Sequence, residues 1–232
     1  IPAAMIAGMA AGFVTAFLQT KLGVPSILAG IVTNMGLYTV NLMVMGWSAN
    51  VSLLKSETIF TLFENTGIGG AWNEALLAGF ITILMGVLLI LFLGPRLGLS
   101  IRATGDNMDM VRASSINPAF TITVGLCVAN AMTALSGAMV GQYQNAADIN
   151  GGTGIVVIGL ACLIIGETVL GRRTLVKGAI AAIVGSAIYR LIYAIVLYTK
   201  IMPVQGLRLI TAVIVALAIA FPTIKNWVLF EK

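Results

Sequence analysis

Polar and charged residues gather in one short stretch, GLSIRATGDNMDMVRASSINP, at residues 98–118. It holds two arginines, two aspartates and two asparagines, in a chain of which only 9% is charged. These side chains offer hydrogen bonds and ion pairs. The stretch could be a solvated loop that orients the chain in a membrane, an anchor at the lipid interface, or a helix that docks into a soluble partner.

The order of residues in this stretch predicts a short helix. Asp106 is suited to cap a helix that runs from about residue 107 to residue 115. Asp109 would add a second carboxylate at the positive end of that helix, and Arg112 would lie beside it at the i, i+3 spacing. Pro118 marks the start of the next apolar segment.

A second group of polar residues lies inside apolar segments, where such side chains are costly and usually face the interior of a helical bundle. Asn34 and Asn41 are seven residues apart and therefore share one helix face. Arg190 falls near the middle of its segment, where it could meet a substrate carboxylate, pair with Glu167 or satisfy backbone carbonyls. Asn130 is a weaker candidate of the same kind. Each of these residues could line a pathway or simply hold helices together.

The composition identifies the class of protein that must position these residues. Of 232 residues, 59% are hydrophobic, and the mean hydropathy is +1.04. This predicts an all-α integral membrane protein. The absence of histidine excludes His-ligated metal sites and Ser-His-Asp triads, and no cofactor or metal site is expected. Cys127 and Cys162 are expected to be packing residues. The net charge of +5 bears on membrane orientation rather than on nucleic acid.

Seven segments are apolar enough to be spanning helices, and together they predict a single transmembrane domain over 1–232. The chain begins within an apolar segment, so we expect one or more N-terminal spans to be missing. The seven segments are roughly 3–20, 25–46, 75–93, 119–141, 155–170, 178–199 and 207–224.

Lysines and arginines predict the orientation. If 98–118 is cytoplasmic, nine of them fall on that side and three on the other, as the positive-inside rule requires. The loops 47–74 and 142–154 would then face outward, and the C-terminus would be cytoplasmic. The pairs Gly8 with Gly12 and Gly137 with Gly141 have the spacing that allows close helix packing. The GGTG run at 151–154 is interpreted as a turn that enters a helix.

Several stretches together resemble one transporter family. The run TGDNMDMVRASSIN, with Gly105, Asn107, Arg112, Ser114 and Asn117, is similar to the coupling segment of permeases from the branched-chain amino acid/ribose family of bacterial ABC importers. The family often has glycine where this chain has Ser115. Three further stretches resemble helices of the same family: ILAGIVTNMGLYTVNLMVMG (27–46), GLACLIIGETVLGRRTLVKGAIAAIVGSAIYRLI (159–192) and LRLITAVIVALAIAFP (207–222).

This resemblance implies a type II-like ABC importer permease in a bacterial cytoplasmic membrane. Its implied partners are cytoplasmic ABC ATPase subunits, an extracytoplasmic substrate-binding protein and a second permease chain in a homodimer. Aromatic or branched-chain amino acids are the implied substrates, and sugars and nucleosides remain open. The coupling residues would be Gly105, Asp106, Asn107, Asp109, Arg112, Ser114 and Asn117. The pathway residues would be Asn34, Asn41, Asn130, Glu167 and Arg190.

Two other functions compete with this hypothesis. A self-contained secondary transporter or channel should show inverted repeats and acidic residues within its spans, but Glu167 is the only such acid and no repeat is visible. An intramembrane enzyme should carry paired acids or a nucleophile with its base, and the sequence shows neither.

Overall fold

The computed structural model describes residues 1–54, 56–64, 72–152, 154–171, 174–199 and 213. In this part of the chain, six helical segments are long and apolar enough to cross a membrane. They confirm six of the seven predicted spans, while the seventh, at 207–224, lies almost wholly outside the described residues. The six are Pro2–Thr20, Ser26–Val44, Asn73–Leu93, Pro118–Tyr143, Ile149–Leu170 and Leu175–Tyr198.

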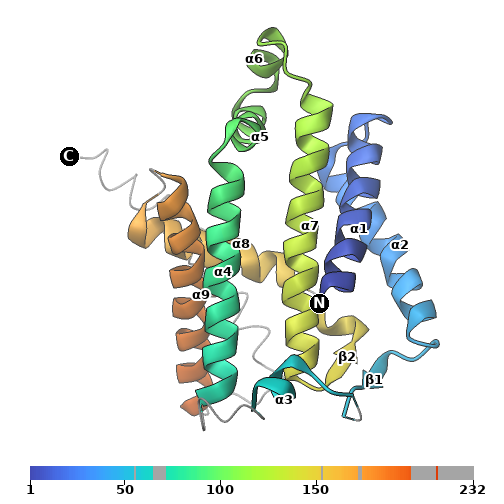
Figure 1. Cartoon of the computed structure of the whole chain (residues 1–232), viewed down its shortest axis with the longest axis vertical. Coiled ribbons are helices and arrows are strands. Elements are labelled where there is room, and N and C mark those ends of the chain that lie inside the picture. The colour runs from blue at the N-terminus through green and yellow to red at the C-terminus, as the bar shows by residue number, and fades with distance from the viewer. Residues whose placement is uncertain (55, 65–71, 153, 172–173, 200–212, 214–232) are drawn as a thin grey trace. The chain divides into compact units, whose positions relative to one another are not determined.

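The chain divides into two compact units, Ile1–Gly151 and Gly152–Lys232. The elements of the first are α1 (Pro2–Thr20), α2 (Ser26–Val44), β1 (Asn50–Ser52), α3 (Ile59–Glu64), α4 (Asn73–Leu93), α5 (Arg96–Asp106), α6 (Met108–Ala113), α7 (Pro118–Tyr143) and β2 (Ala146–Asp148) (Figure 1). The 3-10 helix η2 (Ile149–Gly152) leads into the second unit, which contains α8 (Ile155–Leu170) and α9 (Leu175–Tyr198).

Helix α7 is the centre of the first unit, and α1 packs along it (Figure 1). A side-chain carbon on Gly8 would lie 2.5 Å from the carbonyl oxygen of Asn130, and one on Gly12 would lie 2.5 Å from that of Leu126. Only glycine allows this approach of two backbones, so the packing role predicted for the first glycine pair is confirmed. The two contacts also show that α1 and α7 are antiparallel.

Helix α2 joins this pair through hydroxyl groups. The Oγ1 of Thr15 on α1 and the Oγ1 of Thr33 on α2 are 3.0 Å apart in a buried hydrogen bond. Each hydroxyl also lies within hydrogen-bonding distance of a carbonyl of its own helix, at Ala11 and Ala29. Between apolar helices in lipid, such hydroxyl bonds fix the register of neighbouring helices.

Two predicted outer loops meet at one end of α7. Strand β1 pairs antiparallel with β2, and Asn50 lies opposite Asp148. The α5–α6 segment lies at the other end of α7, which at 26 residues is about 39 Å long. The described strands of loops 47–74 and 142–154 therefore meet at one end of this unit, as the predicted common side of the two loops requires.

Within the first unit, the second glycine pair does not meet another helix as the first pair does. A side-chain carbon on Gly137 would meet nothing within 4 Å, and one on Gly141 would meet only the carbonyl oxygen of Ala146, at 3.6 Å. No described helix of the first unit packs closely on this face of α7. The spacing of small residues permits close packing but does not require that a partner helix be present within the same chain.

The described helices of the second unit, α8 and α9, form an antiparallel hairpin. Gly166 of α8 lies against the backbone of Ala181, and Gly185 of α9 lies against that of Cys162. Gly154 precedes α8 with a φ of 82°, so the predicted turn into a helix is present at Gly154, while Gly151 and Gly152 belong to η2. The glycines of this hairpin are 19 residues apart in sequence, so their contact is not evident from the small-xxx-small spacing within either helix.

The outer faces of the spanning helices are apolar. Ile27 and Val44 of α2 are 79% and 83% exposed, and none of the six described spanning segments has more than 18% of its apolar 18-residue stretch buried within the chain. An exposed apolar surface of this extent is stable in lipid or against other membrane helices. The protein is therefore a multi-pass helical membrane protein.

Candidate functional site

The stretch 98–118 contains two helices rather than the single helix predicted over 107–115. Helix α5 ends at Asp106, and α6 runs from Met108 to Ala113. Asp106 is thus the last residue of the first helix and not the cap of the second, so this part of the prediction is wrong. Asn107 separates the two helices with extended dihedral angles, φ −155° and ψ 105°.

Asn107 caps α6. Its Oδ1 accepts hydrogen bonds from the backbone N–H groups of Asp109 at 3.1 Å and Met110 at 3.0 Å. These are two of the donors that the first turn of a helix leaves unsatisfied. Asp109 lies in that first turn, where a carboxylate is favoured by the helix dipole. The predicted capping chemistry is therefore present, one residue later than expected.

The C-terminal end of α6 is closed by a Schellman motif. The N–H of Ser115 donates to the carbonyl of Arg112 at 3.1 Å, and the N–H of Ile116 donates to that of Val111 at 3.2 Å. Ser115 has a φ of 59°, in the left-handed region that glycine adopts without strain. This turn explains why glycine suits the position of Ser115.

Buried contacts attach α5 and α6 to the start of α7. Val111 of α6 is only 1% exposed. The Oγ1 of Thr104 on α5 and the Oγ1 of Thr121 on α7 are 2.8 Å apart in a buried hydrogen bond. Asn117 caps α7 by accepting from the N–H of Ala119 at 3.0 Å. The segment is thus held at both ends, and Figure 1 shows α5 beside the N-terminal end of α7 and α6 beyond it.

The opposite face of this segment is exposed and polar. An Arg112 nitrogen and an Asp109 carboxylate oxygen are 3.7 Å apart, and their side chains are 63% and 93% exposed. Such an exposed pair contributes little to stability, so its charges remain available to a partner. Of the seven predicted coupling residues, all are exposed: Gly105, Asp106, Asn107, Asp109, Arg112, Ser114 and Asn117.

The predicted pathway residues of the first unit are on two helices. Asn34 and Asn41 are both exposed on α2, beside the face on which Thr33 contacts α1. Asn130 on α7 is half-buried, and its Nδ2 donates to the carbonyl of Leu126 at 2.9 Å. Helix α1 packs on both α2 and α7, so it lies between the two helices that carry these asparagines.

The remaining two are on the helical hairpin of the second unit. Glu167 is half-buried on α8, and Arg190 is exposed on α9, next to the buried Tyr189. Gly166 faces Ala181, and Arg190 lies nine residues, or about 13 Å, further along α9. The pairing of Arg190 with Glu167 that the sequence leaves open stays a prediction.

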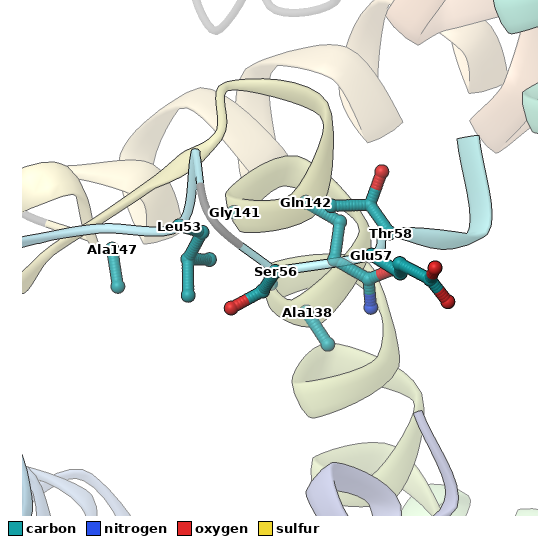
Figure 2. Close-up of a pocket in the computed structure, with 9 residues that line it drawn as sticks. Leu53, Ser56, Glu57, Thr58, Ala138, Gly141, Gln142 and Ala147 are labelled. Carbon is teal, nitrogen blue, oxygen red and sulfur yellow. The ribbon is translucent and has the colours of Figure 1, made fainter. Parts of the chain in front are cut away.

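A cavity of about 390 Å³ at the β1–β2 end of α7 was not predicted from the sequence. Figure 2 shows Glu57 and Gln142 at this cavity, and the Oε1 of Gln142 accepts a hydrogen bond from the N–H of Ile59 at 3.0 Å. The cavity exists because small residues follow one face of α7, as Gly137, Ala138 and Gly141. The small-xxx-small spacing of these residues was the available signal.

Comparisons with known proteins agree with this architecture. A tyrosine transport system permease protein from Clostridioides difficile (strain R20291) is 33% identical over 212 residues, which are 91% of this chain and 68% of that protein. An uncharacterized protein of Rickettsia prowazekii (strain Madrid E) is 28% identical over 221 residues, which are 94% of this chain and 76% of that protein. No solved structure shows a significant match. The model of one family, described as "Branched-chain amino acid transport system / permease component", matches residues 1–223, and the chain belongs to this family of transport permeases.

Proposed function

We propose that this chain is the membrane-spanning subunit of an ATP-driven ABC importer and that α5 and α6 form its contact with a cytoplasmic ATPase. The ATPase would bind the exposed face that carries Asp109 and Arg112. Gly105, Asp106, Asn107, Ser114 and Asn117 would shape or flank that face. The proposal makes the α5–α6 end of α7 cytoplasmic and the β1–β2 end extracytoplasmic.

The observation that carries this proposal is the construction of α6. A helix of six residues is too short to be stable by itself. This one is capped by Asn107, closed by the turn at Ser115 and anchored by buried Val111. A loop that only bears charge for membrane orientation needs none of these features. A rigid polar helix at a membrane boundary is suited to transmit force from a soluble partner.

The comparisons favour amino acids as substrates, and the tyrosine permease makes an aromatic amino acid the first candidate. We propose that an extracytoplasmic binding protein delivers the substrate to a homodimer of this chain. The pathway would be lined by Asn34, Asn41, Asn130, Glu167 and Arg190. Among these, Arg190 is the exposed cation that could receive the substrate carboxylate.

ATP-dependent uptake in proteoliposomes tests this function. The permease would be reconstituted with the ATPase and the binding protein from the same source, and uptake of radiolabelled tyrosine, leucine and ribose would be compared. We expect concentrative uptake of tyrosine only with ATP on the α5–α6 side. Uptake that needs no ATPase and follows an ion gradient would instead support a secondary transporter.

Substitutions of Arg190 test the pathway within the same assay. Arg190→Ala is expected to lower tyrosine uptake more than Arg190→Lys, because lysine keeps the positive charge. Lys177→Ala is the matched control, since Lys177 is an exposed cation at the start of the same helix. Unchanged rate and affinity in both Arg190 variants would contradict the role of Arg190 and leave the ATP-dependence result intact.

A further inference from the structure

The buried hydroxyl pair of Thr104 and Thr121 joins the proposed ATPase contact to the membrane helices. Thr104 is 8% exposed and Thr121 is 2% exposed, and their Oγ1 atoms are 2.8 Å apart. Thr104 belongs to α5, and Thr121 lies in the first turn of α7. This polar contact is therefore at the boundary between the exposed segment and the spanning helices.

The two hydroxyls have more acceptors than protons. Thr104 Oγ1 lies 2.7 Å from the carbonyl oxygen of Ser100, and Thr121 Oγ1 lies 2.9 Å from that of Pro118. Each hydroxyl has one proton to donate. If Thr104 donates to Ser100, Thr121 can donate to Thr104; if Thr121 donates to Pro118, Thr104 can donate to Thr121. In either arrangement one proton holds α5 to α7, and the other bonds to the backbone of one helix.

A second contact lies one turn away on each helix. A side-chain carbon on Gly125 of α7 would lie 3.3 Å from the Cγ2 of Ile101 on α5. Helix α5 therefore lies against α7 over at least two turns, at Thr121 and at Gly125. With a hydrogen bond at one point and close packing at the other, α5 cannot slide along α7 without breaking both.

Close contacts also connect α7, through α1, to helix α2, which carries Asn34 and Asn41. Gly8 and Gly12 of α1 lie against α7, and Thr15 of α1 is bonded to Thr33 of α2. Asn34 follows Thr33 directly. Each step is a backbone approach or a buried hydroxyl bond, both of which fix relative position more tightly than contacts between flexible apolar side chains.

On the basis of the proposed function, we propose that Thr104 and Thr121 are positioning residues that transmit movement of α5–α6 to α7, and through α1 to the face of α2 with Asn34 and Asn41. Spatial continuity alone does not establish coupling, and the physical test is whether removal of the bond separates the two events. Valine is the suitable replacement, since it has a similar shape to threonine and no hydroxyl.

The experiment follows the movement of α7 directly and needs no known substrate. Cys127 lies on α7, where its Cα is next to Gly12 of α1, and Cys162→Ala leaves it as the one cysteine of residues 1–232. The reconstituted permease–ATPase complex would be treated with a membrane-permeant maleimide, with and without ATP plus vanadate. The readout is the ratio of the alkylation rates of Cys127 with and without ATP plus vanadate. The rate of ATP hydrolysis is measured on the same samples. The variants are Thr104→Val, Thr121→Val and their combination.

We expect nucleotide to change the alkylation rate of Cys127 in the unsubstituted protein. Each valine variant should reduce that response by about fivefold, as loss of one buried hydrogen bond allows, while it still binds the ATPase and hydrolyses ATP. The double variant should be no worse than the single variants, because the two residues make one bond. Thr104→Ser and Thr121→Ser should retain the response.

Thr123→Val is the matched control, since among the described residues the Thr123 hydroxyl bonds within α7, to the carbonyl of Ala119 at 2.7 Å. The inference is overturned if the valine variants keep the full response, if they lose the ATPase itself, or if Cys127 of the unsubstituted complex does not respond to nucleotide. A purified permease with which no ATPase associates would instead contradict the proposed function.

Discussion

Gly12 of α1 lies so close to Leu126 of α7 that a side-chain carbon on the glycine would be 2.5 Å from the leucine carbonyl oxygen. Gly8, one helical turn earlier, makes the same kind of contact with Asn130. The two contacts hold α1 against the helix whose N-terminal end carries the α5–α6 segment. Close backbone packing here therefore supports the position of the candidate site.

Gly12→Val is expected to destabilise the protein by about 2 kcal/mol or more, because the two helices must separate to admit the side chain. Gly137→Val is the matched control, since a side-chain carbon there meets nothing within 4 Å. Unfolding of the purified protein in mixed detergent measures both. Equal loss of stability in the two variants would contradict the packing described for α1 and α7.

Asn107→Ala should weaken the first turn of α6, because the Asn107 side chain accepts from two backbone N–H groups there. A lost cap costs about 1 kcal/mol, or about fivefold in amide protection. Hydrogen exchange of the backbone amides of Asp109 and Met110 measures this loss of protection. Asp106→Ala is the control and should leave both amides unchanged; a larger effect from Asp106→Ala would restore Asp106 as the cap.

Ser115→Val should lower stability by about 1 to 2 kcal/mol, because a β-branched side chain is strained at a φ of 59°. Ser115→Gly should be neutral or slightly stabilising, since glycine adopts this conformation freely. Chemical unfolding of the purified protein tests both. Ser114→Val, at a φ of −85°, is the control for loss of a neighbouring hydroxyl, and should cost less than Ser115→Val.

The two ends of α7 should be on opposite sides of the membrane. Asn50 and Asp148 are opposite each other in the β1–β2 pair, so cysteines at both positions should cross-link on oxidation. An impermeant maleimide should label Asn50→Cys in intact cells and should label Arg102→Cys only after the membrane is opened. Labelling of both positions in intact cells would contradict this topology.

The helices and their order could be predicted from the sequence because lipid requires long apolar runs, and six such runs are confirmed. The exposed pair of Asp109 and Arg112 was predicted for a related reason, since helix geometry alone places residues at i, i+3 together. The residue that caps each short helix could be predicted less well. Asp106 and Asn107 are both good caps, and the structure shows that Asn107 begins α6 by its extended backbone and by the hydrogen bonds that its side chain accepts from two N–H groups.

Contacts between distant segments could not be predicted. No sequence pattern marks Thr104 and Thr121 as partners, because their hydrogen bond depends on how α5 folds back along α7. The same holds for β1 and β2, which are three residues each and nearly 100 residues apart. For Gly137 the reverse holds, because its spacing with Gly141 predicts close helix packing that no described helix of the first unit provides.

The most direct test of the account is whether α6 holds an ATPase. The protein would be purified in mild detergent from its native membrane, as wild type and as Asp109→Lys with Arg112→Glu, which reverses both charges but keeps the pair. Asp148→Lys, at the other end of α7, is the control. We expect a soluble ABC ATPase to co-purify with the wild type and the control and to be lost from the double variant. Retention of the ATPase by the double variant, or a wild-type protein that transports without one, would contradict the account.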